Sequence, residues 1–367
     1  MADALETNER RLRRLTEMDR NRAVAGACAA LQAVWTRGRK PARVVLRTDL
    51  VQRRSDTTER ASAAQLVLPR GVAQRFYLLA IFEAHCRLPV DEPWVSDRPL
   101  TGRGSWSDFV AIDGAYDTQS KTYMHETAQD RNGLHLRLRQ IQAALRTLEE
   151  LGADKDQLGP GESERALVQV PRAKNGGRRL YEQFSLMKET GRGNHQTPDT
   201  YTVPANHLSD ATFTVPADFF LNGWIQVLNP SEIATWLILQ ARSQWARDTH
   251  AEAGVYLYGK ARLEEFGLRR DAWEDGCQRL REFGLIRHAR SAPLDSTSPD
   301  ALGLMDWWVR LGRERYEPYR WQVTNQGLAR DAVKVCLREL TIRQKGLATT
   351  ARLRTPEKGE PSSASGV

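Results

Sequence analysis

A group of cationic side chains surrounds the Asn-Gly dipeptide at 175–176 in the first half of the chain. Asn-Gly between two strand-like runs, here 166–170 and 180–186, is the strongest short-range signal of a β-hairpin. Cationic side chains do not stabilise such a turn, but they bind phosphate oxygens well. We therefore expect an anion-binding hairpin with four candidate residues: Arg172, Lys174, Arg178 and Arg179. The alternative is a solvated basic turn without a ligand.

The segment before this hairpin has the periodicity of an amphipathic helix. Its apolar residues recur at four-three spacing: Leu134, Leu138, Ile141, Leu145 and Leu148. That spacing places them on one face. The opposite face carries side chains that can pair with base edges, because Arg matches guanine and Gln matches adenine in the major groove. The candidates on this face are Arg139, Gln140 and Arg146.

A second group of cations lies around a turn in the second half of the chain. The pattern predicts a two-turn helix over 260–266, a tight turn at 267–270 and a third helix over 271–283, followed by strands at 285–289 and 319–323. The cations that could meet an anion there are Lys260, Arg262, Arg269 and Arg270.

The third helix of this half has an exposed face that is mostly acidic. Its members are Asp271, Asp275, Gln278 and Glu282. Phosphates would repel the three carboxylates. Either the cations beside this helix bind DNA, or the helix binds a protein partner, such as the N-terminal arm or a second copy of the chain.

The order of these elements and the segment FGLRRDAWEDGCQRLREFGLI resemble the winged-helix DNA-binding superfamily. In that superfamily a helix enters the major groove of duplex DNA. Two such domains in tandem resemble the replication initiators of bacterial plasmids, in which they bind repeated origin sites and mediate dimer formation. The resemblance to the initiators is one of architecture.

The elements that position these residues follow a repeated plan. Leu66-Val67-Leu68-Pro69 and Phe213-Thr214-Val215-Pro216 each precede helical material, and each half has a later helix that ends at a Gly, Gly152 or Gly284. A helix over 5–36 and a polar linker over 37–64 come first. The expected fold class is α+β, mainly helical, with two tandem winged-helix domains and an N-terminal helical arm. The divisions are 1–64 (helix and basic linker), 65–200, 201–345, and 346–367 (disordered tail).

Composition narrows the function classes. The net charge is +8, but residues 1–60 alone carry +6, so any anion-binding surface is local. The GxxxxGK match at 254–260 is followed by Ala261, where a nucleotide-binding loop needs Ser or Thr for Mg²⁺. Four scattered cysteines predict reduced thiols and no metal site. We expect no catalytic residue, no cofactor, no metal and no membrane segment.

The function expected from the sequence is that of a bacterial, cytoplasmic, non-enzymatic protein that binds double-stranded DNA, with homodimer formation possible. A replication initiator-like role on a plasmid or mobile element is the first interpretation. A winged-helix transcriptional regulator is the second. The third, from another class, is an adaptor whose winged helices bind protein. The neutral charge of the two halves and the acidic face at 271–282 favour this adaptor.

Overall fold

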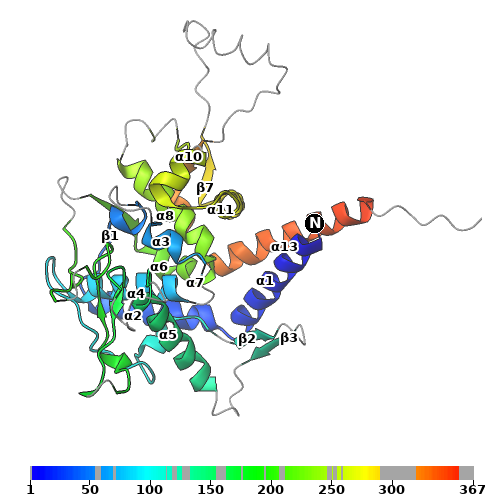
Figure 1. The fold of residues 1–367 in the computed structure, drawn as a ribbon. Coiled ribbons are helices and arrows are strands. Elements are labelled where there is room, and N and C mark those ends of the chain that lie inside the picture. The colour runs from blue at the N-terminus through cyan, green and yellow to red at the C-terminus, as the bar shows by residue number, and fades with distance from the viewer. Residues whose placement is uncertain are drawn as a thin grey trace, which may run out of the picture.

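The computed structural model is mixed α+β and mainly helical, which confirms the fold class expected at that level. Besides the helices, the described residues form four small two-stranded sheets (Figure 1). The structure describes residues 2–53, 59–68, 72–112, 114–117, 122–125, 133–153, 163–174, 177–193, 196–205, 211–245, 250, 254–257, 259–289 and 320–354.

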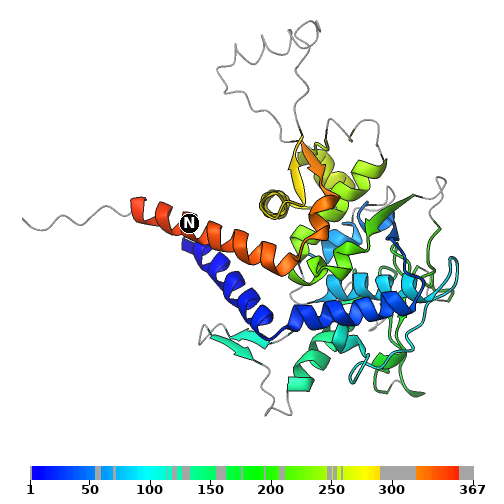
Figure 2. The same cartoon turned by 180° about the vertical axis from the view of Figure 1, so that it is seen from behind.

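The N-terminal arm consists of two helices, α1 (Ala2–Arg20) and α2 (Ala23–Arg37). The prediction of a single helix over 5–36 is wrong at Arg22, where the helix is interrupted. Arg22 has a left-handed backbone with φ of 56°, a conformation that an α-helix of L-residues cannot contain. Because of this break, α1 lies beside the C-terminal helix α13 (Ala332–Arg354), while α2 lies along the body (Figures 1 and 2).

The segment predicted as a linker contains a strand. β1 (Arg43–Arg47) pairs antiparallel with β6 (Thr212–Pro216), so residues on either side of the first unit meet in one sheet. Val44 and Leu46 alternate inward and are fully buried. Next come η1 (Thr48–Leu50) and α3 (Ser62–Gln65). Residues 66–68, predicted to open the first unit as 213–216 opens the second, follow α3 without forming a strand.

The first unit is built on α4 (Ala73–Arg87), which is buried over almost its whole length. Val95 then bridges Ser185, so an extended segment joins the later hairpin. The remaining elements are η2 (Trp106–Phe109), β2 (Gly114–Asp117), β3 (Thr122–His125), α5 (Gly133–Glu149), β4 (Val168–Gln169), η4 (Tyr181–Gln183) and β5 (Ser185–Leu186). β4 pairs with β5, and β2 with β3.

The second unit repeats part of this order after β6, although its described residues include no counterpart of β2 and β3. Val255 bridges Trp321 as Val95 bridges Ser185, and β7 pairs with β8 as β4 pairs with β5. Its elements are α6 (Asp218–Leu221), α7 (Trp224–Val227), α8 (Pro230–Trp245), α10 (Gly259–Ala261), the π-helical turn η5 (Arg262–Phe266), α11 (Arg270–Glu282), β7 (Ile286–His288), β8 (Trp321–Val323) and η6 (Asn325–Ala329). Each half thus contains a long helix, a bridging segment, a short helical turn, a second long helix and a hairpin.

The two halves share one hydrophobic core, so the division expected at residue 200 does not separate two cores. The rings of Phe82 on α4 and Phe220 on α6 stack with centroids 4.7 Å apart. The buried Gln226 amide donates to the carbonyl of Phe109 and accepts from the amide of Ala111, at 2.8 and 3.0 Å. At the other end α13 runs to Arg354, so the helix includes part of the predicted tail. Residues 355–367 lie outside the described residues.

Candidate nucleic-acid interface

The hairpin of the first unit forms as the sequence predicts within its described part. Arg172 and Arg179 form an antiparallel β-bridge through their backbones, and the amide of Ala173 donates to the carbonyl of Arg178 at 3.0 Å. Arg172, Lys174 and Arg178 are exposed, and no hydrogen bond or ion pair holds their side chains to another described residue. The turn itself, 175–176, lies outside the described residues. Three of the four expected anion-binding side chains are therefore available to a ligand.

Arg179 has a different role from the one predicted. Its Nε donates to Oε2 of Glu149 at 2.9 Å and its Nη2 donates to Oε1 of Glu150 at 3.1 Å. The side chain is only 19% exposed. Arg179 therefore attaches the hairpin to the end of α5, and two carboxylates compensate its charge.

Helix α5 presents the two faces that its periodicity predicts. Ile141, Leu145 and Leu148 are fully buried. Arg139 and Arg146 are exposed, two turns apart on the other face. Gln140 is half-buried beside them. The structure thus brings two arginines to the surface of the helix that precedes the basic hairpin.

The cations predicted at the α10–α11 turn differ in their surroundings. Lys260 is exposed, with Nζ 3.8 Å from a Glu264 oxygen, and Arg270 is exposed with Nε 2.7 Å from a Glu274 oxygen. Arg269 is exposed. Arg262 is 9% exposed and its Nε donates to the carbonyl of Leu268. Arg262 supports the turn, so the expectation that it meets an anion at the surface is not met.

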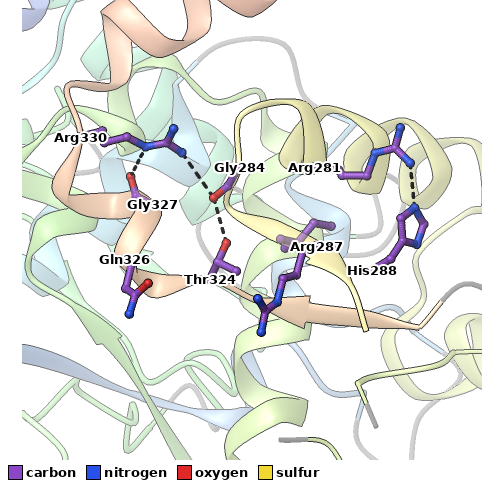
Figure 3. Close-up of a pocket in the computed structure, with 9 residues that line it drawn as sticks. Arg281, Gly284, Arg287, His288, Thr324, Gln326, Gly327 and Arg330 are labelled. Carbon is purple, nitrogen blue, oxygen red and sulfur yellow. Dashed lines mark hydrogen bonds between the residues drawn. The ribbon is translucent and has the colours of Figure 1, made fainter. Parts of the chain in front are cut away.

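A more basic site lies at the base of the second hairpin, and the sequence interpretation missed it. Three arginines line a shallow, open cavity of about 580 Å³, and no carboxylate belongs to its described lining (Figure 3). We call this the arginine cavity; it is lined by Arg281, Gly284, Ile286, Arg287, His288, Thr324, Gln326, Gly327 and Arg330. A concave surface with three positive charges and no negative one attracts anions.

The local structure holds each arginine in place. Arg330 Nη2 donates to the carbonyl of Phe283 at 2.8 Å, which places a cation on the carbonyls at the end of α11. Thr324 Oγ1 donates to the carbonyl of Gly284 at 2.8 Å. Arg287 points outward from β7, and its Nε donates to Oε1 of Gln322 at 3.1 Å. These contacts orient the guanidinium groups without neutralising them.

His288 stays neutral beside these charges. Burial, and then the charge of Arg281, lower the pKa of its imidazole. Nη1 of Arg281 lies 2.7 Å from Nε2 of His288, the geometry of an arginine donating to a neutral ring. The ring stacks on Trp321 at 4.4 Å between centroids. The positive charge of the arginine cavity therefore comes from its arginines.

The signals for this site were weak but present. Ile286-Arg287-His288 alternates an apolar with a polar residue, as a half-buried strand does, so Arg287 was identifiable as outward-facing. Arg330 gave no such signal, because only the fold brings η6 against the end of α11.

The acidic face of α11 meets a partner within the same chain at one end. Asp271, Asp275 and Gln278 are exposed. Oε1 of Glu282 accepts from Nη1 of Arg343 on α13 at 3.1 Å, and Glu282 also pairs with Arg279. Docking of a helix near this face was expected from the N-terminal arm or a second copy. The structure places the C-terminal helix there, and the N-terminal arm reaches the same end of α11 through Arg11, whose guanidinium lies over the ring of Phe283.

The thiols do not suggest nucleophiles. Burial raises the pKa of Cys28 to about 11 and the pKa values of Cys86 and Cys336 to about 12. All four cysteines are unpaired. Within the described residues, no group of three or more His, Cys, Asp or Glu side chains is placed to hold a metal ion. The helices in the same part of the chain include none that is long and apolar enough to cross a membrane.

Comparison with protein-family models, with curated proteins and with solved structures finds no significant match.

Proposed function

We propose that this protein binds duplex DNA through two winged-helix units. The observation that carries the proposal is the repeated order of elements together with its strand pairing. In each half a segment after the first long helix bridges the last strand of a hairpin that follows a second long helix. That arrangement is the one expected of a winged helix, whose second long helix enters the major groove.

The distribution of positive charge supports DNA as the ligand. The first unit has exposed Arg139 and Arg146 on its second long helix and an exposed basic hairpin beside it. The second unit has the arginine cavity at the base of its hairpin. Phosphate contacts from arginines and lysines position a protein on the duplex, while base contacts read its sequence.

The two units within one core support a replication initiator-like role in preference to a single-site regulator, because each unit can contact a separate segment of the site. DNase footprinting on DNA flanking the gene separates the two roles. Protection of several iterated repeats supports the initiator, and protection of one operator near a promoter supports the regulator.

The exposed carboxylates Asp271, Glu274 and Asp275 favour a second candidate for the second unit, an assembly surface for a protein. Under this alternative only the first unit contacts DNA. The arginine cavity argues for DNA at the second unit, since its cations lie at the other end of α11.

The test is the salt dependence of binding to a labelled 30-bp duplex, measured by fluorescence anisotropy. Each phosphate contact contributes a slope of about 0.9 to the log–log plot of affinity against salt. We expect Arg287→Ala to reduce the slope by about one such contact. Arg103→Ala, which removes an exposed arginine before η2, is the matched control and should leave the slope unchanged. Absence of salt-dependent binding by the unaltered protein would overturn the proposal.

A further inference from the structure

We propose that a second cavity beside the arginine cavity binds a nucleotide, with its base among the aromatic side chains of the lining and its phosphate at Arg281. This inference goes beyond DNA binding by the two units. The tryptophan cavity, as we call it, has a volume of about 750 Å³, within the range of small-molecule sites. Its described lining is Tyr256, Leu257, Gly259, Arg262, Arg270, Trp273, Glu274, Cys277, Gln278, Arg281, His288 and Trp321.

The cavity lies between one side of α11 and the hairpin. Arg270, Trp273, Cys277 and Arg281 follow one another at spacings of three or four, so they line a single stripe of that helix. The ends of β7 and β8 face this stripe through His288 and Trp321. These two walls belong to regular elements, and Tyr256 and Leu257 of the irregular segment before α10 complete the lining.

Four of the twelve described lining residues are aromatic: Tyr256, Trp273, His288 and Trp321. Trp273 and Trp321 are only 6% and 7% exposed, so Tyr256, which is 41% exposed, has a more accessible ring than either tryptophan. The ring of His288 already stacks on Trp321 with an interplanar angle of 27°. Such surfaces attract a planar ligand, because stacking of a base on an aromatic side chain stabilises binding whatever the base.

The charge of the cavity favours an anion. Its described lining has three arginines and one carboxylate. Arg262 is buried and donates to the carbonyl of Leu268, and Arg270 lies 2.7 Å from the carboxylate, Glu274, so the available charge is that of Arg281. Arg281 has no carboxylate partner among the described residues, and its hydrogen bond goes to the neutral ring of His288. A guanidinium with an uncompensated charge at the edge of an aromatic cavity suits the phosphate of the same ligand.

Two further residues define the chemistry. Gln278 is exposed on α11 within the lining, and its amide can both donate to and accept from a base edge. Cys277 is 2% exposed, and burial raises the pKa of its thiol, so it stays protonated. The lining therefore offers recognition groups and no thiolate nucleophile, which indicates binding in preference to covalent chemistry.

The arginine cavity extends the site. Arg281 and His288 belong to both linings, so a phosphate at Arg281 is continuous with Arg287 and Arg330 (Figure 3). The nucleotide can be free in solution or can be an unpaired residue of a DNA strand. Both sources share the base and the phosphate that this site recognises.

The experiment is isothermal titration calorimetry of the full chain with AMP, adenosine, ribose 5-phosphate and single-stranded (dA)10. We expect AMP to bind, and adenosine and ribose 5-phosphate to bind at least tenfold more weakly, since each lacks one of the two recognised groups. Arg281→Ala should weaken AMP at least tenfold, and Gln278→Ala several-fold. Arg103→Ala removes an exposed arginine that belongs to neither cavity, and should have no effect.

Two outcomes separate the sources. Binding of (dA)10 without AMP, lost in Arg281→Ala, assigns the site to an unpaired strand and supports the proposal. Binding of neither AMP nor (dA)10 at millimolar concentration would overturn it, as would equal weakening by Arg103→Ala and Arg281→Ala. Circular dichroism checks that Arg281→Ala is folded. Gln278→Ala, a change at an exposed position, provides the test if it is not.

Discussion

Burial divides the arginines of this chain into two kinds. Arg47 is 19% exposed and donates from Nη1 to a fully buried carboxylate of Glu189 at 2.8 Å, which ties β1 to the segment after β5. Arg11 and Arg179 likewise bind carboxylates of other elements. Arg172, Arg178 and Arg287 instead face solvent. A count of positive charges therefore overstates the charge that is available to DNA.

A buried histidine should make stability depend on pH. His85 is 7% exposed, and its Nε2 lies 3.0 Å from the carbonyl of Val45. Burial lowers the pKa of His85 from 6.5 to about 4, outweighing the hydrogen bond to Val45, which raises it. The unfolded chain therefore takes up this proton first, as pH falls below 6.5, and the folded state loses stability down to about pH 4. From this residue we expect a loss of about 1 kcal/mol between pH 7.5 and pH 5.5.

Urea denaturation at the two pH values measures this loss. His85→Gln keeps an amide donor for the carbonyl of Val45 but does not titrate, so the variant should lose this part of the pH dependence. Identical pH profiles for the two proteins would show that the imidazole does not remain neutral in the folded state.

The hairpin of the first unit carries the prediction at the scale of an element. Replacing Arg172, Lys174 and Arg178 together by Ala removes three exposed cations without touching an ion pair of the described residues. If each contacts one phosphate, the log–log salt slope of duplex binding should shrink by about 3 units, equally for all sequences. Anisotropy titrations at several salt concentrations measure the slope.

Arg179→Ala is the informative comparison. Because its charge is directed to Glu149 and Glu150, this variant should lower the thermal midpoint and leave the salt slope nearly unchanged. If Arg179→Ala reduced the salt slope as strongly as Arg172→Ala, the two arginines would have the same role, contrary to this prediction.

Local patterns explain which elements the sequence predicted. The four-three spacing of α5 and the helices and strands predicted between 260 and 323 depend on residues close in the chain. The β1–β6 sheet does not, because Val44 pairs with Val215, far along the chain. The packing of α1 against α13 likewise joins the two ends of the described chain. Pairing over such separations leaves no local signal.

The candidate site follows the same physical division. Arg172, Lys174 and Arg178 were predicted because their hairpin is local. The arginine cavity brings together residues 281–288 and 324–330, which only the pairing of β7 with β8 unites. Two predicted anion-binding residues have other roles, because contacts with distant or buried groups decide them. Arg179 pairs with the carboxylates of Glu149 and Glu150, and Arg262 donates to the carbonyl of Leu268 in the turn.

At the scale of the whole molecule, α1 and α13 lie side by side and project from the body that both units share (Figure 2). Asn8 on α1 is buried and donates to the carbonyl of Leu340 at 3.1 Å. Arg11 on the same helix reaches the second unit, where Nη2 donates to Oε2 of Glu232 on α8 at 2.8 Å. The guanidinium also lies over the ring of Phe283. These contacts attach the arm to the end of α11.

Arg11 should therefore matter far more to stability than its position on an arm suggests. Glu232 is 2% exposed, so Arg11→Ala leaves a buried carboxylate without its cation. Removing one partner of a buried ion pair costs about 3–5 kcal/mol. Urea denaturation of the full chain should show this loss in the free energy of unfolding.

Arg13→Ala provides the matched control from the same helix. Arg13 pairs with Glu9 at the surface, with both side chains about half exposed, and exposed pairs contribute about 0–1 kcal/mol. The double change Arg11→Met and Glu232→Gln removes both charges and should recover part of the stability lost in Arg11→Ala, because no buried charge is then unpaired. Equal effects of Arg11→Ala and Arg13→Ala would mean that α1 is not fastened to α8 through Glu232, and that the arm is held by its contacts with α13 alone.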